Sequence, residues 1–591
     1  MARRRILVAA VLALLGGARG VSAHLEPYVP VPIPPGEPLY HVHCESGAAA
    51  SHACSHVDLL AQLPLSSFGF GAASANDVWG WTDPQTGREY ALLGLDVGTA
   101  FVDVSVPDAP VYLGLLPTHT RVSLWRSIKV YADHAFVVSE ARGHGMQVFD
   151  LTRLRDVPAP PMLFGEDAYY PAFTHAHNVV VDEISGFAYA VGTNLCAGGL
   201  HMVDIRAPKS PVFAGCYAAD GYTHDAQCAV YTGPDADYAG RQLCFASNED
   251  TLTIVDVTDK SAPRLVSRSS YAGTGYTHQG WLTEDQSYFL LDDELDEVDF
   301  HHATRTWVWD VADLDAPALL GVHDAAPTSI DHNQYVVADH VFQANYTAGL
   351  RVLRMGDLAR LELAEVAFFD TVPENDDPQF HGAWNNYPFF ASGIVLVSDI
   401  ERGLFVLEPD LAAVPECADG LDNDRDGRID YPQDRGCESA QGASELPWNG
   451  VQVDVRPGTL FNPIHVFSRG VVPVALLGSD TFDIERVAPA SLVFGPDAAP
   501  LAHRGCPHVA DVNRDGRPDL VSHHRIRQSG IALGDREACL AGELDDGTPF
   551  EGCDRIRSAA CGIGFELVLL WPLLRALRRR RTRYRQSART R

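Results

Sequence analysis

Histidine recurs just ahead of short apolar runs that read as β-strands. The phrases are "THAHNVVVD" (174–182), "YTHDAQCAV" (222–230), "YTHQGWL" (276–282), "SIDHNQYVV" (329–337) and "QFHGAWNN" (379–386). In a repeated structural unit these side chains would converge, and neutral imidazoles beside carboxylates can hold a divalent cation. The candidates for such a site are His177, His224, Asp225, His278, Asp331, His332 and His381.

A structural role predicts the same repetition. Buried histidines that hydrogen-bond the backbone of a neighbouring unit would fix the register of each strand. The sequence leaves both interpretations open.

A second candidate is the acidic stretch "LLDDELDEVDFHH" (290–302). Like charges crowded on one hairpin are costly unless they are solvated or neutralised, and a hard cation neutralises them well. A solvated acidic loop is the alternative. The carboxylates are Asp292, Asp293, Glu294, Asp296, Glu297 and Asp299.

Two later stretches have the spacing of calcium loops. In "ECADGLDNDRDGRIDYPQDRGCES" (416–439) and "DVNRDGRPDL" (511–520), carboxylates alternate ahead of a glycine. Oxygen ligands on a tight loop are typical of Ca²⁺ sites, although the helix and closing glutamate of an EF-hand are missing. The expected ligands are Asp422, Asp424, Asp426, Asp430 and Asp434 in the first loop, and Asp511, Asn513, Asp515 and Asp519 in the second.

Other chemistry is not indicated by the sequence. It contains no P-loop, "GxSxG" elbow, "HExxH" or dinucleotide fingerprint. The formal charge of −32 over 591 residues argues against nucleic-acid binding, which needs a basic surface. An enzyme is therefore the less favoured class.

A repeat of about 50 residues positions these side chains. Five units share an ending: "GTAFVDV" (98–104), "GMQVFDL" (145–151), "GGLHMVDI" (198–205), "DTLTIVDV" (250–257) and "TRTWVWDV" (304–311). Degenerate copies follow at 349–355 and 403–409. Seven units of four short strands predict a β-propeller, because one blade cannot bury both of its faces. The first strand of each blade lies nearest the axis, so the histidines would ring one mouth of the central channel.

The last unit lacks a fourth strand. The segment "VDLLAQLPLSSFG" (57–69) is similar to the fourth strands of other units, and we expect it to complete the last blade and remove an open edge. The predicted fold is all-β: a seven-bladed propeller (57–412) closed by an N-terminal strand, a calcium-loop linker (415–440) and a small β-sandwich-like domain (449–557).

The phrase "ANDVWGWTDPQTGREYALLGLDVGTAFVDVSVPDAPVYLG" (75–114), the histidine series and the "IVDV" endings resemble the bacterial choice-of-anchor B proteins, which are LVIVD-repeat β-propellers. The resemblance covers residues 40–410. It implies a secreted, surface-held propeller and no particular activity.

Both ends carry processing signals. Residues 1–23 read as a secretory signal peptide. Residues 561–591 combine an apolar run with an arginine cluster, which resembles a C-terminal surface-sorting signal with Cys561 as the attachment point. A single membrane-spanning tail is the alternative.

Export makes disulfides reasonable. The safest pairs are Cys44–Cys54, within a linker at 24–56, and Cys417–Cys437, which flanks the first calcium loop. Cys196–Cys216 and Cys228–Cys244 are further candidates.

The function predicted from these features is that of an exported binding module, anchored to the membrane or cell surface, with Ca²⁺-stabilised C-terminal loops and an unknown protein or glycan ligand. The alternative is a metal-dependent hydrolase whose site lies at the channel mouth.

Overall fold

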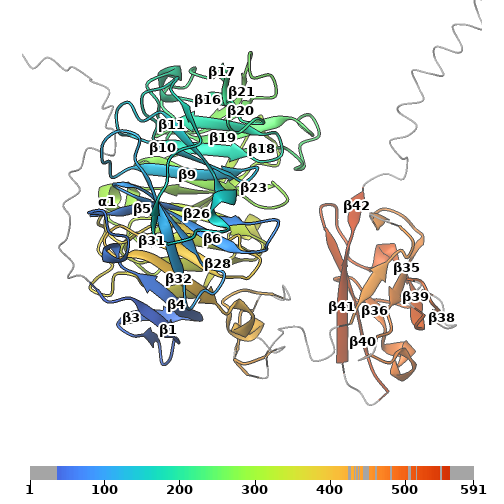
Figure 1. Ribbon diagram of the computed structural model, residues 1–591. Helices are drawn as coiled ribbons and strands as arrows, with labels where there is room; N and C mark the ends of the chain where they lie inside the picture. Colours follow the sequence, from blue (N-terminus) through green and yellow to red (C-terminus); the bar gives the residue numbers. More distant parts are fainter. Residues whose placement is uncertain are drawn as a thin grey trace, which may run out of the picture. The chain divides into compact units, whose positions relative to one another are not determined.

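The computed structural model (Figure 1) describes residues 36–423, 428–431, 433, 437, 439–442, 451–459, 462–479, 482–502, 507–513, 516–545 and 549–559. The predicted signal peptide and tail, with Cys561, lie outside the described residues, as do Asp424, Asp426, Asp434 and Asp515. The chain divides into two units, Met1–Leu421 and Asp422–Arg591.

The first unit is all-β and propeller-like. Its described part forms seven sheets, and each of them contains a set of four antiparallel strands. The first strands are β5 (Ala75–Thr82), β9 (Arg126–Tyr131), β14 (Asn178–Asp182), β18 (Asp225–Val230), β22 (Thr277–Leu282), β26 (Asn333–Val337) and β30 (Ala383–Tyr387). They contact one another in that order, and β30 contacts β5.

The second and third strands fill the middle of each sheet. The second strands are β6 (Glu89–Leu95), β10 (His134–Ser139), β15 (Phe187–Val191), β19 (Gln242–Ser247), β23 (Tyr288–Asp293), β27 (His340–Ala344) and β31 (Val395–Asp399). The third strands are β7 (Gly98–Asp103), β11 (Met146–Asp150), β16 (His201–Asp204), β20 (Leu252–Asp256), β24 (Arg305–Asp310), β28 (Leu350–Met355) and β32 (Gly403–Pro409). Their apolar residues are almost all buried, as sheets that pack face to face require.

The fourth strand of the last sheet comes from the N-terminal segment. The strand β4 (Val57–Leu63) runs antiparallel to β32, with Leu63 opposite Leu404 and Val57 opposite Pro409. This is the pairing that the sequence analysis predicted for 57–69. The other fourth strands are β8 (Val111–Pro117), β13 (Ala168–Tyr170), β17 (Val212–Cys216), β21 (Arg264–Ser269), β25 (Ala318–Asp324) and β29 (Leu363–Phe369).

Short elements extend three sheets. The strand β1 (Leu39–Val42) pairs with β4, and β3 (His52–Ser55) pairs with both β2 (Ala48–Ala49) and β29. A two-residue strand, β12 (Met162–Leu163), runs parallel to β8. One short helix, α1 (Asp296–Phe300), follows β23.

The described part of the second unit contains two four-stranded sheets. One has the order β33 (Val453–Val455), β35 (Val471–Leu476), β39 (Asp519–Arg525), β38 (His508–Ala510); the other has β37 (Ala499–Pro500), β36 (Val493–Phe494), β40 (Glu537–Glu543), β41 (Pro549–Arg555). A parallel pair, β34 (Pro463–His465) and β42 (Arg557–Ala559), accompanies them. Buried residues of both sheets, such as Val474 and Leu540, belong to one hydrophobic core.

The predicted disulfides Cys44–Cys54, Cys196–Cys216 and Cys228–Cys244 are confirmed. Cys417 and Cys437 are each disulfide-bonded, and Cys539 pairs with Cys553. So many disulfides are typical of an extracellular protein. Among the described residues, no helix is long and apolar enough to cross a membrane.

Candidate functional site

Four of the five recurrent histidines converge where the first strands begin. His177, His224, His278 and His332 line a cavity of about 10 Å³, which is room for one water molecule or ion. Their ring centroids follow one another at 4.4, 4.0 and 4.4 Å. Trp125, Arg126, Asn178, Asn333 and Trp384 complete the lining.

The fifth histidine lies apart. His381 is more exposed than the other four, and its Nδ1 lies 3.0 Å from Oε1 of Glu401. In that sheet Trp384 lines the small cavity instead.

Each of the four rings is held through Nδ1. His177 Nδ1 lies 2.8 Å from Oε1 of Glu140 and His278 Nδ1 lies 2.9 Å from Oδ1 of Asp292. His224 and His332 use backbone carbonyl groups of the next sheet, those of His278 and Trp384. The contacts of His177, His224 and His332 join neighbouring sheets, as a structural role predicts, and that of His278 lies within one sheet. All four fix how each Nε2 atom is directed.

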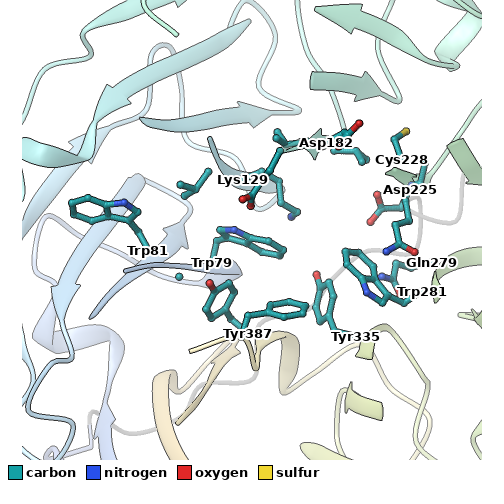
Figure 2. A pocket seen from close by; sticks show the side chains of 18 of the residues that line it. Trp79, Trp81, Lys129, Asp182, Asp225, Cys228, Gln279, Trp281, Tyr335 and Tyr387 are labelled. Atoms are coloured by element: carbon teal, nitrogen blue, oxygen red, sulfur yellow. Dashed lines mark hydrogen bonds between the residues drawn. The ribbon is translucent and has the colours of Figure 1, made fainter. Parts of the chain in front are cut away.

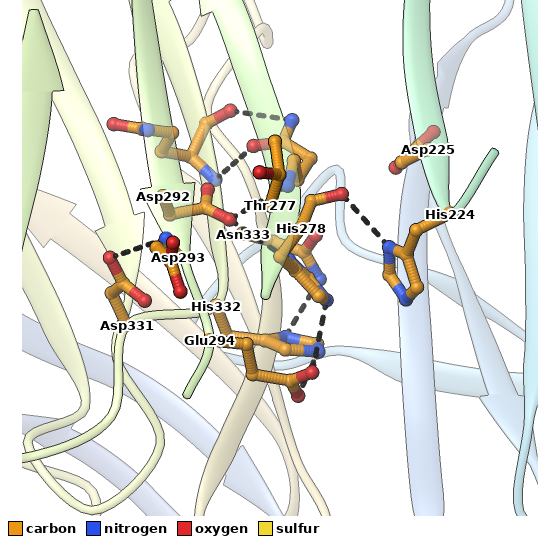
Figure 3. A network of polar contacts seen from close by, with 12 residues as sticks. His224, Asp225, Thr277, His278, Asp292, Asp293, Glu294, Asp331, His332 and Asn333 are labelled. Atoms are coloured by element: carbon orange, nitrogen blue, oxygen red, sulfur yellow. Dashed lines mark hydrogen bonds and ion pairs between the residues drawn. The ribbon is translucent and has the colours of Figure 1, made fainter. Parts of the chain in front are cut away.

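Glu294 lies beside two of these rings (Figure 3). Its Oε2 is 3.8 Å from Nε2 of His278, and its Oε1 is 3.7 Å from Nε2 of His332. The hydroxyl of Tyr346 donates a hydrogen bond of 2.8 Å to Oε1. All three ligand-type residues, His278, His332 and Glu294, are at most 3% exposed, and their side-chain nitrogen and oxygen atoms are close enough to share one metal ion.

The acidic stretch is buried, so the alternative of a solvated loop is wrong for most of it. Only Asp299 of the predicted group is exposed. Burial raises the pKa of Glu294 to about 7 and that of Asp292 well above its usual range. Within the described part of the chain, no lysine or arginine forms an ion pair with these buried carboxylates, which are Asp292, Asp293, Glu294, Asp296, Glu297 and Asp331.

The other predicted site residues lie in three different places. Asp331 joins it, because its Oδ2 accepts a hydrogen bond of 3.2 Å from the backbone N–H of Asp293. Asp296, Glu297 and His302 form a second group of close ligand-type atoms. Asp225 instead faces a larger cavity, and burial raises its pKa to about 6.

That larger cavity has a volume of about 480 Å³ and receives side chains from all seven first strands or the residues just after them (Figure 2). Much of its lining is aromatic: Trp79, Trp81, Trp281, Tyr335, Tyr387 and Phe389. Its polar lining includes Lys129, Asp182, Glu183, Asp225, Gln227 and Gln279. The ammonium of Lys129 lies 4.3 Å from the centroid of the Trp79 ring.

Sequence reasoning missed this cavity because it followed the recurrent histidines, whereas the lining of the cavity includes residues three positions further on, which alternation turns to the opposite face. In β22 the register shifts between Thr277 and Gln279, and such a bulge re-aims side chains. His278 lines the small cavity and Trp281 the large one. Comparing the residues three positions after each histidine would have identified Trp281 and Tyr335. The same comparison after Trp384 would have identified Tyr387.

The calcium-loop candidates belong to the second unit. Asp519 uses both carboxylate oxygens to accept backbone N–H groups, those of Gly478 at 3.1 Å and Val512 at 2.7 Å. Asp511 accepts the N–H of Gly516 at 3.1 Å. Asp422, Asp430 and Asn513 are also described, whereas the other expected ligands are not. Calcium binding stays a prediction.

Comparison with known proteins identifies one repeat. The LVIVD repeat matches residues 239–270, which include β19, β20 and β21. This chain carries an LVIVD repeat. No curated protein matches it.

Several solved structures are similar at low identity. A protein from Lactobacillus plantarum is 15% identical over 55% of this chain and 88% of its own, with a TM-score of 0.37. The β-propeller domain of Cps50 (Swd1) from Myceliophteria thermophila is 11% identical over 57% and 96%, also with a TM-score of 0.37. A putative 6-phosphogluconolactonase from Bacteroides uniformis is 13% identical over 49% and 84%, with a TM-score of 0.35.

Proposed function

We propose that this LVIVD-repeat chain is an exported, surface-held binding protein, and that its ligand is a saccharide bound in the 480 Å³ cavity. The first unit is then a seven-bladed propeller closed by β4, and the cavity lies on its axis. The circular order of contacts from β5 through β30 and back to β5 supports this architecture.

The lining of the cavity carries the proposal. Small-molecule sites combine apolar and aromatic walls with a few converging polar groups, and this volume is typical of them. A sugar ring has apolar C–H faces that pack on aromatic rings and hydroxyls at its edge. Trp281 and Tyr387 offer such faces, while Asp225, Gln227 and Gln279 offer hydrogen-bond donors and acceptors.

The calcium loops and the C-terminal tail would hold this binding site at the cell surface. The Ca²⁺ loops around Asp422 and Asp511 would stiffen the connection to the anchor, and the tail with Cys561 would hold the protein at the membrane or cell surface. Choice-of-anchor B proteins, which the chain resembles, are surface-held, although the type of anchor varies between members.

The experiment is a binding screen of the full chain against a panel of mono- and disaccharides, read by tryptophan fluorescence and then by calorimetry. Trp281→Ala removes one aromatic wall, and we expect it to weaken binding at least about tenfold, because binding hot spots are enriched in tryptophan and cost about 2 kcal/mol or more when truncated.

Phe213→Ala is the matched control, because Phe213 is an exposed aromatic residue of β17 and does not line the cavity. It should bind as the wild type does. Absence of saccharide binding, or equal affinity of Trp281→Ala and wild type, would reject the proposal.

A further inference from the structure

We propose that His278, His332 and Glu294 bind one divalent transition-metal ion of the zinc class. The three side chains come from adjacent parts of the fold: His278 lies in β22, Glu294 follows β23 and His332 precedes β26. This inference does not depend on the saccharide site.

The distances fit a metal ion that draws the ligands together slightly. Zinc bonds to imidazole and carboxylate of about 2.1 Å at the tetrahedral angle set two ligand atoms about 3.4 Å apart. The two nitrogen–oxygen separations are 3.8 and 3.7 Å. They are too long for hydrogen bonds, so a direct contact does not satisfy Glu294 Oε2.

Glu294 supplies an independent observation. It is 2% exposed, and its Oε2 has no hydrogen-bond partner among the described residues. An oxygen removed from water without a partner is costly, and a bound cation is one of the few groups that offset this cost. Oε2 is the oxygen nearer to His278.

The contacts behind the histidines are those of metal ligands. A metal-bound histidine usually donates its other ring N–H to a carboxylate or carbonyl group, which fixes the tautomer. The carbonyl of Trp384 accepts from Nδ1 of His332 when that nitrogen carries the proton, which is the tautomer a metal ligand at Nε2 needs; the side-chain nitrogen of Asn333, 2.8 Å from the same Nδ1, would donate to it in the other tautomer. Oδ1 of Asp292 already accepts the backbone N–H of Gln279 and plays the same part for His278. With Nδ1 engaged in this way, Nε2 is the nitrogen of each ring that lies toward Glu294.

The donor set indicates which metals are expected. Two imidazole nitrogens and one carboxylate suit Zn²⁺ and neighbouring first-row ions, whereas Ca²⁺ takes oxygen ligands. Three protein ligands also leave a coordination position for water or another small ligand. A hydrolytic activity would need that open position.

The test measures metal in the full chain, purified without chelators, by elemental analysis. A chelator-stripped sample is then titrated with Zn²⁺ by calorimetry and with Co²⁺ by visible absorption, which reports the coordination number and geometry of the bound ion. We expect about one equivalent in the wild type. Glu294→Gln should lose it while keeping the shape of the side chain, and Asp292→Asn should weaken binding about 10- to 100-fold.

His381→Ala is the matched control, since His381 belongs to the same sequence pattern but lies apart from the cluster. It should retain the metal. The proposal is overturned if the stripped wild type binds no Zn²⁺ or Co²⁺, whatever the variants do. It is equally overturned if folded Glu294→Gln, checked by circular dichroism, binds as tightly as His381→Ala.

Discussion

At the scale of residues, a shared sequence phrase does not guarantee a shared environment. The repeated histidines were predictable as a group, and four of them do meet at one cavity. His381 does not, because Trp384 takes the corresponding place in its sheet. The burial of the acidic stretch was not predictable, since adjacent carboxylates normally favour solvent. The aromatic cavity was missed because its lining residues differ in type from one first strand to the next, as Val180, Gln227 and Trp281 do, so no repeated residue marks them.

A buried acid outside the proposed metal site allows a prediction at this scale. Burial, and then the nearby Glu401 carboxylate, raise the pKa of Asp399 to about 7. Folding therefore takes up a proton, and this residue lowers stability progressively as the pH rises from about 4 to about 7.

Asp399→Asn removes that titration. Its free energy of unfolding relative to wild type should rise by roughly 2–3 kcal/mol between pH 5 and pH 8. Oδ1 accepts the N–H groups of Glu401 and Arg402, and asparagine can keep both bonds. Urea denaturation of the variant and the wild type at pH 5 and pH 8 measures this relative stability. If the variant differs from the wild type by the same amount at both pH values, Asp399 keeps its ordinary pKa.

At the scale of elements, the sequence was most informative where a pattern repeats. The third-strand endings located every unit of the repeat, because each of these strands is buried on both faces and must remain apolar. The pairing of β4 with β32 was also predictable, since a unit without its fourth strand needs one. The added strands β1 and β3 were not, because they extend sheets that are already complete.

The role of β4 leads to a stability prediction. Leu59 of β4 is fully buried in the core that β4 shares with β32. Leu59→Ala should lower the free energy of unfolding by about 2–4 kcal/mol, through lost burial and the cavity left behind.

Val212→Ala, at an exposed position of the fourth strand β17, should change stability by less than about 0.5 kcal/mol. Chemical denaturation of both variants gives the comparison. Similar small losses would mean that β4 contributes little to the stability of the first unit.

At the scale of the whole molecule, the chain forms two units that are stabilised by different hydrophobic cores. The first relies on large apolar cores between sheets, and the second on one smaller core. The division after residue 421 falls within the linker that the sequence analysis expected at 415–440. The ligand was not, because neither cavity corresponds to a standard sequence motif.

Calcium removal should affect the second unit selectively. A ligand at 100 times its Kd stabilises a domain by about 2.7 kcal/mol, which for about 100 residues shifts the melting temperature by roughly 10 °C. We expect a calorimetric transition that moves by this amount between excess Ca²⁺ and a calcium chelator.

Asp511→Asn should reduce that shift, whereas Asp545→Asn, at an exposed position outside both loops, should not. If the melting temperature of the wild type is the same with Ca²⁺ and with chelator, the calcium loops have no part in the proposed function.

The pairing of β4 with β32 also constrains the order of events when the chain is made. Leu59 and Leu407 are partners across 348 residues, so one strand leaves the ribosome long before the other. Until then β4 presents an unpaired apolar edge, and such non-local pairing is slow and prone to aggregation. A nonsense mutation anywhere before β32 would therefore remove part of the last sheet. It would also leave β4, near the start of the chain, without the strand it pairs with.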